Sequence, residues 1–250
     1  MELYGLIGNP LSHSFSSAFF TEKFASEGID ARYLNFELPD IGDLMEMLAE
    51  YPDLRGFNVT IPYKEAVMPY LTDISAEARA IGAVNVVKIT TDVSGAPLLH
   101  GYNTDAPAFA RSIATILPDA SSMLRALVLG TGGASKAVCF ALRMLGIEPV
   151  LVSRNRRQGV ITYADLTPEV MTDHLVIVNT TPLGMWPDTD RCPDIPYDLV
   201  TDRHVCMDLT YNPAVTLFMQ KCIDRGASVK NGADMLRLQA LLSWQIWHTD

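Results

Sequence analysis

The chain has 250 residues, a formal net charge of −10 and a hydrophobic fraction of 48%. This length allows a substantial core and predicts two domains. The acidic balance argues against nucleic acid as a partner, and no apolar run reaches the length of a membrane span. Residues 1–10 lack a basic segment and a long apolar stretch, so we expect no signal peptide. The four cysteines, Cys139, Cys192, Cys206 and Cys222, show no short paired spacing. We therefore expect reduced thiols in a cytoplasmic protein, and no metal site.

Strand and helix patterns alternate over the first hundred residues. Strands are expected at 3–8, 32–37, 56–59, 84–89 and 98–102, and the last two are expected to pair around a turn at Ser94-Gly95. Helices are expected at 14–27, 41–50, 64–70 and 76–81. This alternation predicts a mainly parallel sheet with helices on its faces.

The second half continues the α/β alternation. Helices are expected at 105–116, 136–145, 214–224 and 234–248, and strands at 124–129, 149–152, 175–179, 205–209 and 227–230. The pattern predicts an N-terminal α/β domain at 1–102 and a Rossmann-like nucleotide-binding domain at 103–234. The C-terminal helix, 235–250, is expected to pack back on the first domain.

A glycine-rich turn, Gly130-Thr-Gly-Gly-Ala-Ser135, joins the strand that ends at Leu129 to the helix that follows. Glycines allow close backbone approach and a helix N-terminus favours negative charge, so this order predicts a pyrophosphate site. Ser135 stands where the full fingerprint has its third glycine. The alternative is a tight strand-to-helix turn with no ligand.

The next strand ends in a basic segment, Ser153-Arg-Asn-Arg-Arg157. An NAD site normally has a carboxylate at this end of the strand, whereas Glu148 stands at the opposite end. The planar guanidinium of arginine suits phosphate, so the segment predicts NADP, with Arg154 as its main contact. The alternative is a solvated basic turn.

Polar clusters at 11–16, 58–64, 82–85 and 102–105 follow predicted strands in the first half. Taken singly, Ser14, Ser16 and Asp105 fit helix caps and Lys64 fits a solvated lysine. Gln239 lies on the apolar face of the last helix, where its amide needs a ligand or a backbone carbonyl as its partner.

Together the clusters resemble the shikimate dehydrogenase family. The shared pattern runs in the same order over nearly the whole chain. Its first-half motifs are Gly-Asn-Pro-Leu-Ser-His-Ser-Phe-Ser (8–16), Asn-Val-Thr-Ile-Pro-Tyr-Lys (58–64), Gly-Ala-Val-Asn (82–85) and Gly-Tyr-Asn-Thr-Asp (101–105). Its second-half motifs are Gly-Thr-Gly-Gly-Ala (130–134), Asn-Thr-Thr-Pro-Leu-Gly-Met (179–185), Asp-Leu-Thr-Tyr-Asn-Pro (208–213) and Gly-Ala-Asp-Met-Leu…Gln-Ala (232–240).

The resemblance implies that 1–102 is the substrate-binding catalytic domain and that 103–234 binds NADP, and it implies a role for each matching residue. Ser14 and Ser16 would bind the substrate carboxylate, and Lys64 and Asp105 would form the catalytic pair. The ring hydroxyls would be bound by Thr60, Asn85, Asp105 and Gln239, with Tyr211 near the substrate. The pyrophosphate would be held by Gly130, Gly132, Gly133 and Ala134. The 2′-phosphate end would be bound by Ser153, Arg154 and Arg157. The nicotinamide side would be lined by Thr180, Thr181, Met207 and Gly232.

The chain departs from the family pattern at two places. The family usually has Asn-Arg-Thr where this chain has Ser153-Arg154-Asn155, so the arginine is kept and its neighbours change. The short interval between 157 and 175 predicts that the usual intervening helix is shortened or absent.

The implied activity is the reversible NADPH-dependent reduction of 3-dehydroshikimate to shikimate in chorismate biosynthesis. A quinate/shikimate dehydrogenase is one alternative, which pocket details at Ser14, Ser16 and Thr60 would decide. A catalytically silent module that senses NADP or shikimate is another, although it would need no proton donor such as Lys64. We expect only small-molecule partners, in a monomer or a homodimer.

Overall fold

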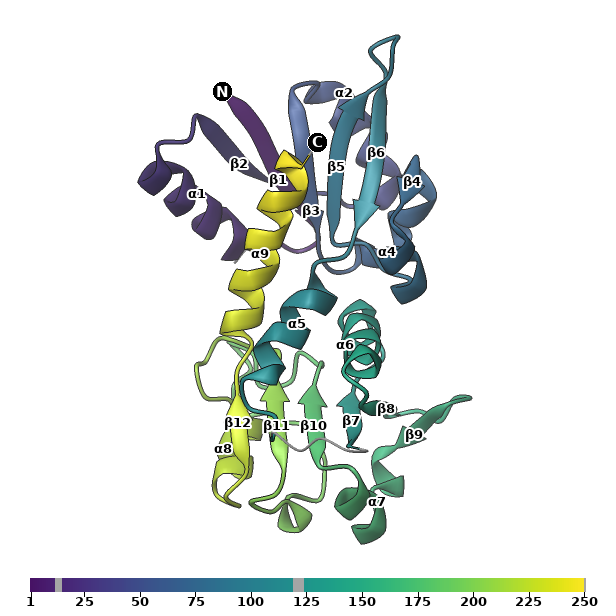
Figure 1. Ribbon diagram of the computed structural model, residues 1–250, viewed down its shortest axis with the longest axis vertical. Coiled ribbons are helices and arrows are strands. Elements are labelled where there is room, and N and C mark those ends of the chain that lie inside the picture. Colours follow the sequence, from purple (N-terminus) through teal and green to yellow (C-terminus); the bar gives the residue numbers. More distant parts are fainter. Residues whose placement is uncertain (12–14, 119–123, 250) are drawn as a thin grey trace. The chain divides into compact units, whose positions relative to one another are not determined.

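The computed structural model describes residues 1–11, 15–118 and 124–249 (Figure 1). The chain divides into two compact units. The first comprises Met1–Thr104 and Arg237–Asp250, and the second comprises Asp105–Leu236. Among the helices of the described residues, none has both the length and the apolar character that a membrane span requires.

The first unit contains a six-stranded sheet in the order β2-β1-β3-β5-β6-β4. Its strands are β1 (Glu2–Gly8), β2 (Ala31–Glu37), β3 (Leu54–Val59), β4 (Asp73–Ile74), β5 (Val86–Thr91) and β6 (Pro97–Tyr102). β1 pairs in parallel with β2 and β3, whereas β5 runs antiparallel to β3 and β6. The sheet is therefore mixed. A tight turn joins β5 directly to β6, which makes these two strands antiparallel. The carboxylate of Asp92 stabilises this turn by accepting hydrogen bonds from the backbone N–H groups of Ser94 and Ala96.

The helices of this unit are α1 (Phe15–Glu27), α2 (Leu44–Glu50), α3 (Tyr63–Ala66) and α4 (Ala76–Ile81), with single 3-10 turns η1 (Ile41–Asp43) and η2 (Met68–Tyr70). The helix expected over 64–70 is interrupted, since Pro69 lies in the first turn of η2 and has no N–H for an α-helical hydrogen bond. Apolar side chains of the sheet and α2, among them Ile7, Leu44 and Phe57, form one buried core.

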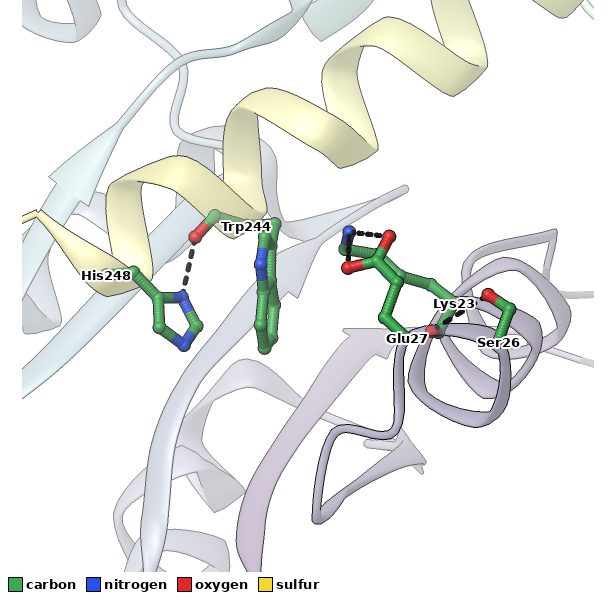
Figure 2. A network of polar contacts seen from close by, with 5 residues as sticks. All are labelled: Lys23, Ser26, Glu27, Trp244 and His248. Carbon is green, nitrogen blue, oxygen red and sulfur yellow. Dashed lines mark hydrogen bonds and ion pairs between the residues drawn. The ribbon is translucent and has the colours of Figure 1, made fainter.

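The C-terminal helix α9 (Ala233–His248) packs against the first unit through aromatic rings, as predicted. Tyr4 stacks on Trp247 with ring centroids 4.7 Å apart. Lys23 forms an ion pair with Glu27 and lies 5.6 Å from the centroid of the Trp244 ring (Figure 2). These contacts join α1, β1 and the end of α9 in one buried aromatic cluster.

The second unit contains an all-parallel sheet in the order β12-β11-β10-β7-β8-β9. Its strands are β7 (Arg125–Leu129), β8 (Glu148–Ser153), β9 (Val160–Thr162), β10 (Val176–Asn179), β11 (Val205–Asp208) and β12 (Ser228–Lys230). The chain builds outward from β7 through β8 to β9, then returns to β10 on the other side of β7. This topology confirms the Rossmann-like prediction and puts the switch point, where such folds bind ligands, between β7 and β10.

The helices of the second unit are α5 (Asp105–Ala114), α6 (Gly133–Met144), α7 (Pro168–Asp173) and α8 (Leu217–Ile223), with 3-10 turns η3 (Tyr163–Asp165) and η4 (Tyr197–Leu199). The intervening helix α7 is short, because β9 and η3 occupy most of the interval. α8 begins later than expected, because the Thr216 hydroxyl accepts from Met219 N at 3.2 Å and caps the helix there.

Candidate active site

The glycine turn lies at the switch point of the parallel sheet. Gly130 N donates to Val152 O at 2.9 Å, and Thr180, which follows β10, donates from its backbone and its hydroxyl to Leu129 O at 3.0 and 2.7 Å. Gly130 has a φ of +114°, and a Cβ there would lie 2.7 Å from Thr180 Oγ1. The ends of β7, β8 and β10 therefore meet at a position that accepts only glycine without strain.

The N-terminus of α6 begins inside this turn, three residues earlier than the sequence indicated. Gly132 is the N-cap residue and makes no side-chain cap hydrogen bond. Ser135 is buried and donates its hydroxyl to Gly132 O at 2.6 Å, so it satisfies the turn internally in place of the third glycine. Gly132 has no side chain to cap the first-turn amides, and the positive end of the helix dipole lies at this turn, which fits a pyrophosphate.

The basic segment follows the carboxyl end of β8. Glu148 begins this strand and Ser153 ends it, so the end that faces the switch-point edge has no strand carboxylate. Arg154 and Arg157 are exposed there. The ligand-facing end of β8 is thus basic and lacks a carboxylate, which suits a phosphate and not a ribose diol.

The arginines of this segment differ in their partners. Arg156 forms an ion pair with Asp165, whose carboxylate also accepts from the backbone N and the hydroxyl of Thr162, both at 2.7 Å. Burial raises the pKa of Tyr163, and the nearby charge of Arg154 opposes that rise. Arg156 thus has a structural partner within η3, which leaves Arg154 and Arg157 as the arginines suited to a ligand phosphate.

A buried polar network that was not predicted from the sequence lies at the carboxyl ends of β10 and β11. Asp208 is fully buried and accepts from Asn179 Nδ2 at 3.1 Å, Thr210 N at 2.9 Å and Thr216 Oγ1 at 2.6 Å. Asn179 Oδ1 accepts from the backbone and hydroxyl of Thr181 at 3.0 and 2.7 Å. Burial raises the pKa of Asp208, and these hydrogen bonds oppose the rise. The network therefore holds the loop at Thr181 in place. The sequence feature that indicates such a network is a polar residue, Asn179 or Asp208, at the end of each of two apolar strands.

The other predicted nicotinamide-side residues belong to the second unit as well. Met207 is fully buried within β11. Gly232 N donates to Thr210 O at 3.0 Å, which ties the start of α9 to the loop after β11. Tyr211 is half-buried in that loop.

The predicted substrate residues of the first unit follow its parallel strands. Ser14 lies outside the described residues, and Ser16 is buried in the first turn of α1. Thr60 N donates to Ile7 O at 2.9 Å, which holds the end of β3 beside β1. Lys64 is half-buried in α3, and its carbonyl accepts from Val84 N at 2.8 Å.

The third and fourth polar clusters meet through paired hydrogen bonds. Thr104 N donates to Asn85 Oδ1 at 2.7 Å, and Asn85 Nδ2 donates to Thr104 Oγ1 at 3.0 Å. Asn85 O accepts from Val59 N at 2.9 Å. Asp105 follows Thr104 directly, begins α5 and is buried, and Gln239 is buried on α9. The fold of the first unit thus brings together the β3 end, Asn85 and Thr104, which are far apart in sequence.

The strand ends of the first unit thus present amide and hydroxyl side chains, which suit a small polyhydroxylated ligand. Over the ranges that the structure describes, no three His, Cys, Asp or Glu side chains are grouped to hold a metal ion. The fold and the glycine turn define the class of protein: a two-unit α/β protein with a Rossmann-like dinucleotide-binding unit.

Comparisons with known proteins give the family. The family model of the shikimate dehydrogenase substrate binding domain matches residues 6–87. A shikimate dehydrogenase (NADP(+)) of Methanococcus maripaludis is 37% identical over 98% of this chain and 91% of the relative. The Thermus thermophilus shikimate 5-dehydrogenase in complex with NADP(H) and shikimate has a TM-score of 0.84 and 33% identity, covering 99% of this chain and 94% of that one. A Corynebacterium glutamicum quinate dehydrogenase in complex with NAD has a TM-score of 0.84 and 26% identity, covering 99% and 93%. The chain belongs to the shikimate dehydrogenase family.

Proposed function

We propose that the protein catalyses the reversible NADPH-dependent reduction of 3-dehydroshikimate to shikimate, a step of chorismate and aromatic amino-acid biosynthesis. The observation that carries this proposal is near full-length similarity to a relative named shikimate dehydrogenase (NADP(+)). The glycine turn at the switch point and the arginines after β8 supply the matching cofactor chemistry.

The proposed substrate site lies on the first unit and the start of α5. Ser14 and Ser16 bind the carboxylate, which hydroxyl donors stabilise. The ring hydroxyls are bound by Thr60, Asn85, Asp105 and Gln239, and Tyr211 lies near the substrate. The buried amides of Asn85 and Gln239 support this assignment, because buried amides recognise hydroxyl groups by both donating and accepting.

Lys64 and Asp105 are the proposed catalytic pair. Hydride addition to a ketone leaves an alkoxide, which must be stabilised and must gain a proton. The Lys64 ammonium stabilises this charge and donates the proton, and the Asp105 carboxylate orients the ammonium. In the oxidative direction, the Lys64 amine accepts the proton from the substrate hydroxyl.

NADPH, when bound, supplies the hydride. Its pyrophosphate would be held by the backbone of Gly130, Gly132, Gly133 and Ala134, and its 2′-phosphate end by Ser153, Arg154 and Arg157. The nicotinamide side would be lined by Thr180, Thr181, Met207 and Gly232. The uncapped N-terminus of α6 supports the first assignment, and the absence of a carboxylate at the end of β8 supports the second.

We further propose a cytoplasmic monomer or homodimer. The four cysteines are free thiols, three of them buried, which fits a reducing compartment.

Parallel steady-state kinetics test the function. We expect the largest kcat/KM for shikimate with NADP+, and much smaller values for quinate or NAD+. Comparable efficiency with quinate would assign a quinate/shikimate dehydrogenase instead. Calorimetric binding of NADP+ and shikimate without turnover would assign a sensing module.

A further inference from the structure

A chain of buried hydrogen bonds links β2, β3 and α9 in the first unit and ends at the backbone of Gln239, a proposed substrate residue. Tyr33 OH donates to Asn58 Oδ1 at 2.8 Å, and Asn58 Nδ2 donates to Ser243 Oγ at 2.9 Å. Ser243 Oγ donates to Gln239 O at 2.8 Å. Tyr33, Asn58 and Ser243 are all buried, so water does not compete for these bonds.

The direction of donation along this chain is determined by proton counting. A hydroxyl has one proton, and Ser243 gives its proton to the Gln239 carbonyl, so it accepts from Asn58. Asn58 uses its second N–H on Asn85 O at 3.2 Å. A half-turn of the Asn58 amide would set its oxygen against the Asn85 carbonyl, which is repulsive. Tyr33 and Ser243 therefore hold the amide in one orientation from its two ends.

Asn85 is the point where this chain meets the proposed site. Its carbonyl accepts from both Asn58 Nδ2 and Val59 N, and its side-chain amide is paired with Thr104. Ser243 Oγ also lies 3.4 Å from Thr104 Oγ1. Ser243 thus contacts the partners of Asn85 from two sides, although it belongs to α9.

The surroundings of Tyr33 keep its hydroxyl in place as a hydrogen-bond donor. Its ring stacks on Phe20, with centroids 4.7 Å apart and an interplanar angle of 14°. Burial raises the pKa of Tyr33, and a hydrogen bond with the Ser16 side chain opposes that rise. The phenol stays protonated, so its hydroxyl can donate to Asn58, and it connects α1 to the same network.

We propose that Tyr33 and Ser243 are positioning residues of the substrate site, because they fix the Asn58 amide that holds Asn85 in place. This inference rests on the proposed shikimate activity. Neither residue is required to touch the substrate. Loss of either hydroxyl removes one of the hydrogen bonds that hold the Asn58 amide against Asn85. The looser amide weakens binding of shikimate and leaves the nucleotide unit unchanged.

The test uses the full-length variants Tyr33→Phe and Ser243→Ala, their double variant, and the control Ser112→Ala. Ser112 suits the control because its buried hydroxyl has no hydrogen-bond partner within the part of the chain that the structure describes. We expect each single variant to raise the KM for shikimate about fivefold to tenfold, as loss of one buried hydrogen bond does. The KM for NADP+ should stay unchanged in every variant. The double variant should raise the shikimate KM by less than the product of the single effects, since both changes act through Asn58.

Three results would overturn the inference: an unchanged shikimate KM in both single variants, a double effect equal to the product, or an equal loss of NADP+ affinity. For a variant with too little turnover, the thermal shift that shikimate induces replaces KM; it should shrink while the shift with NADP+ persists. A wild-type protein without shikimate turnover would refute the proposed function. Wild-type turnover with unaffected variants would refute the positioning role alone.

Discussion

Gly130→Ala tests whether the turn after β7 binds the pyrophosphate. At a φ of +114° an alanine costs about 1–3 kcal/mol in backbone strain. Its Cβ would also lie 2.7 Å from Thr180 Oγ1 and 3.2 Å from Thr181 Cγ2. Thr180 Oγ1 donates to Leu129 O, so moving it away breaks a hydrogen bond worth roughly 1 kcal/mol. The substitution therefore both destabilises the unit and displaces the loop after β10.

Gly146→Ala is the matched control. Gly146 follows the other end of α6 with a φ of +75°, and a Cβ there meets nothing within 4 Å. Its backbone strain is of the same order, so it should lower Tm by about 2–10 °C. We expect Gly130→Ala to lower Tm further and to raise the KM for NADP+ by at least about tenfold, whereas Gly146→Ala leaves that KM unchanged.

The assays are thermal unfolding with and without NADP+, and KM for NADP+ at saturating shikimate. Wild-type NADP+ affinity in Gly130→Ala would refute the assignment of the turn. An equal loss of affinity in Gly146→Ala would show that strain at α6, and not the obstructed turn, is responsible.

Three further outcomes are expected. Lys64→Ala should reduce kcat by about 10²- to 10⁴-fold, the usual contribution of a proton donor, with shikimate binding by calorimetry little changed; near-normal turnover would exclude the role. Arg154→Ser should raise the KM for NADP+ by about 10- to 100-fold and leave that for NAD+ unchanged, while Arg156→Ser, which loses only its ion pair with Asp165, should affect neither. Burial lowers the pKa of His204, so the unfolded chain takes up a proton that the folded protein resists. Stability should therefore fall as pH drops from about 6.5 towards the lower folded-state pKa. Tm measured against pH should fall less steeply in His204→Gln, and identical slopes would contradict the reasoning.

Features that depend on residues close together in the sequence could be predicted from the sequence. The glycine turn at 130–135 follows β7 and opens α6, as its order along the chain indicates. The opposite placement of Glu148 and Arg154 followed from strand direction alone, because a parallel strand has only one end at the ligand edge.

The strand pair β5–β6 was predicted from the turn between the two strands, whereas the shortest elements and the antiparallel pairing of β3 with β5 were not predictable in this way. β4 and β9 have two and three residues, too few to show a period. The pairing of β5 with β3 depends on which strands become neighbours in the sheet, and apolar runs look alike in either strand direction. The helix expected from 136 begins at Gly133, because a glycine-rich first turn has no helical pattern that the sequence would show.

The sequence by itself determined the order of strands and helices, the phosphate-binding turn and the polar residues that end each strand, because these are local properties of the chain. Only the tertiary structure decided which polar groups meet. Asn58 and Ser243 are 185 positions apart, yet they share a buried hydrogen bond. Asn179 and Asp208 end adjacent strands and share another. A periodic pattern identifies the face of an element and not its partner, so such pairs follow only from how the sheets and α9 pack.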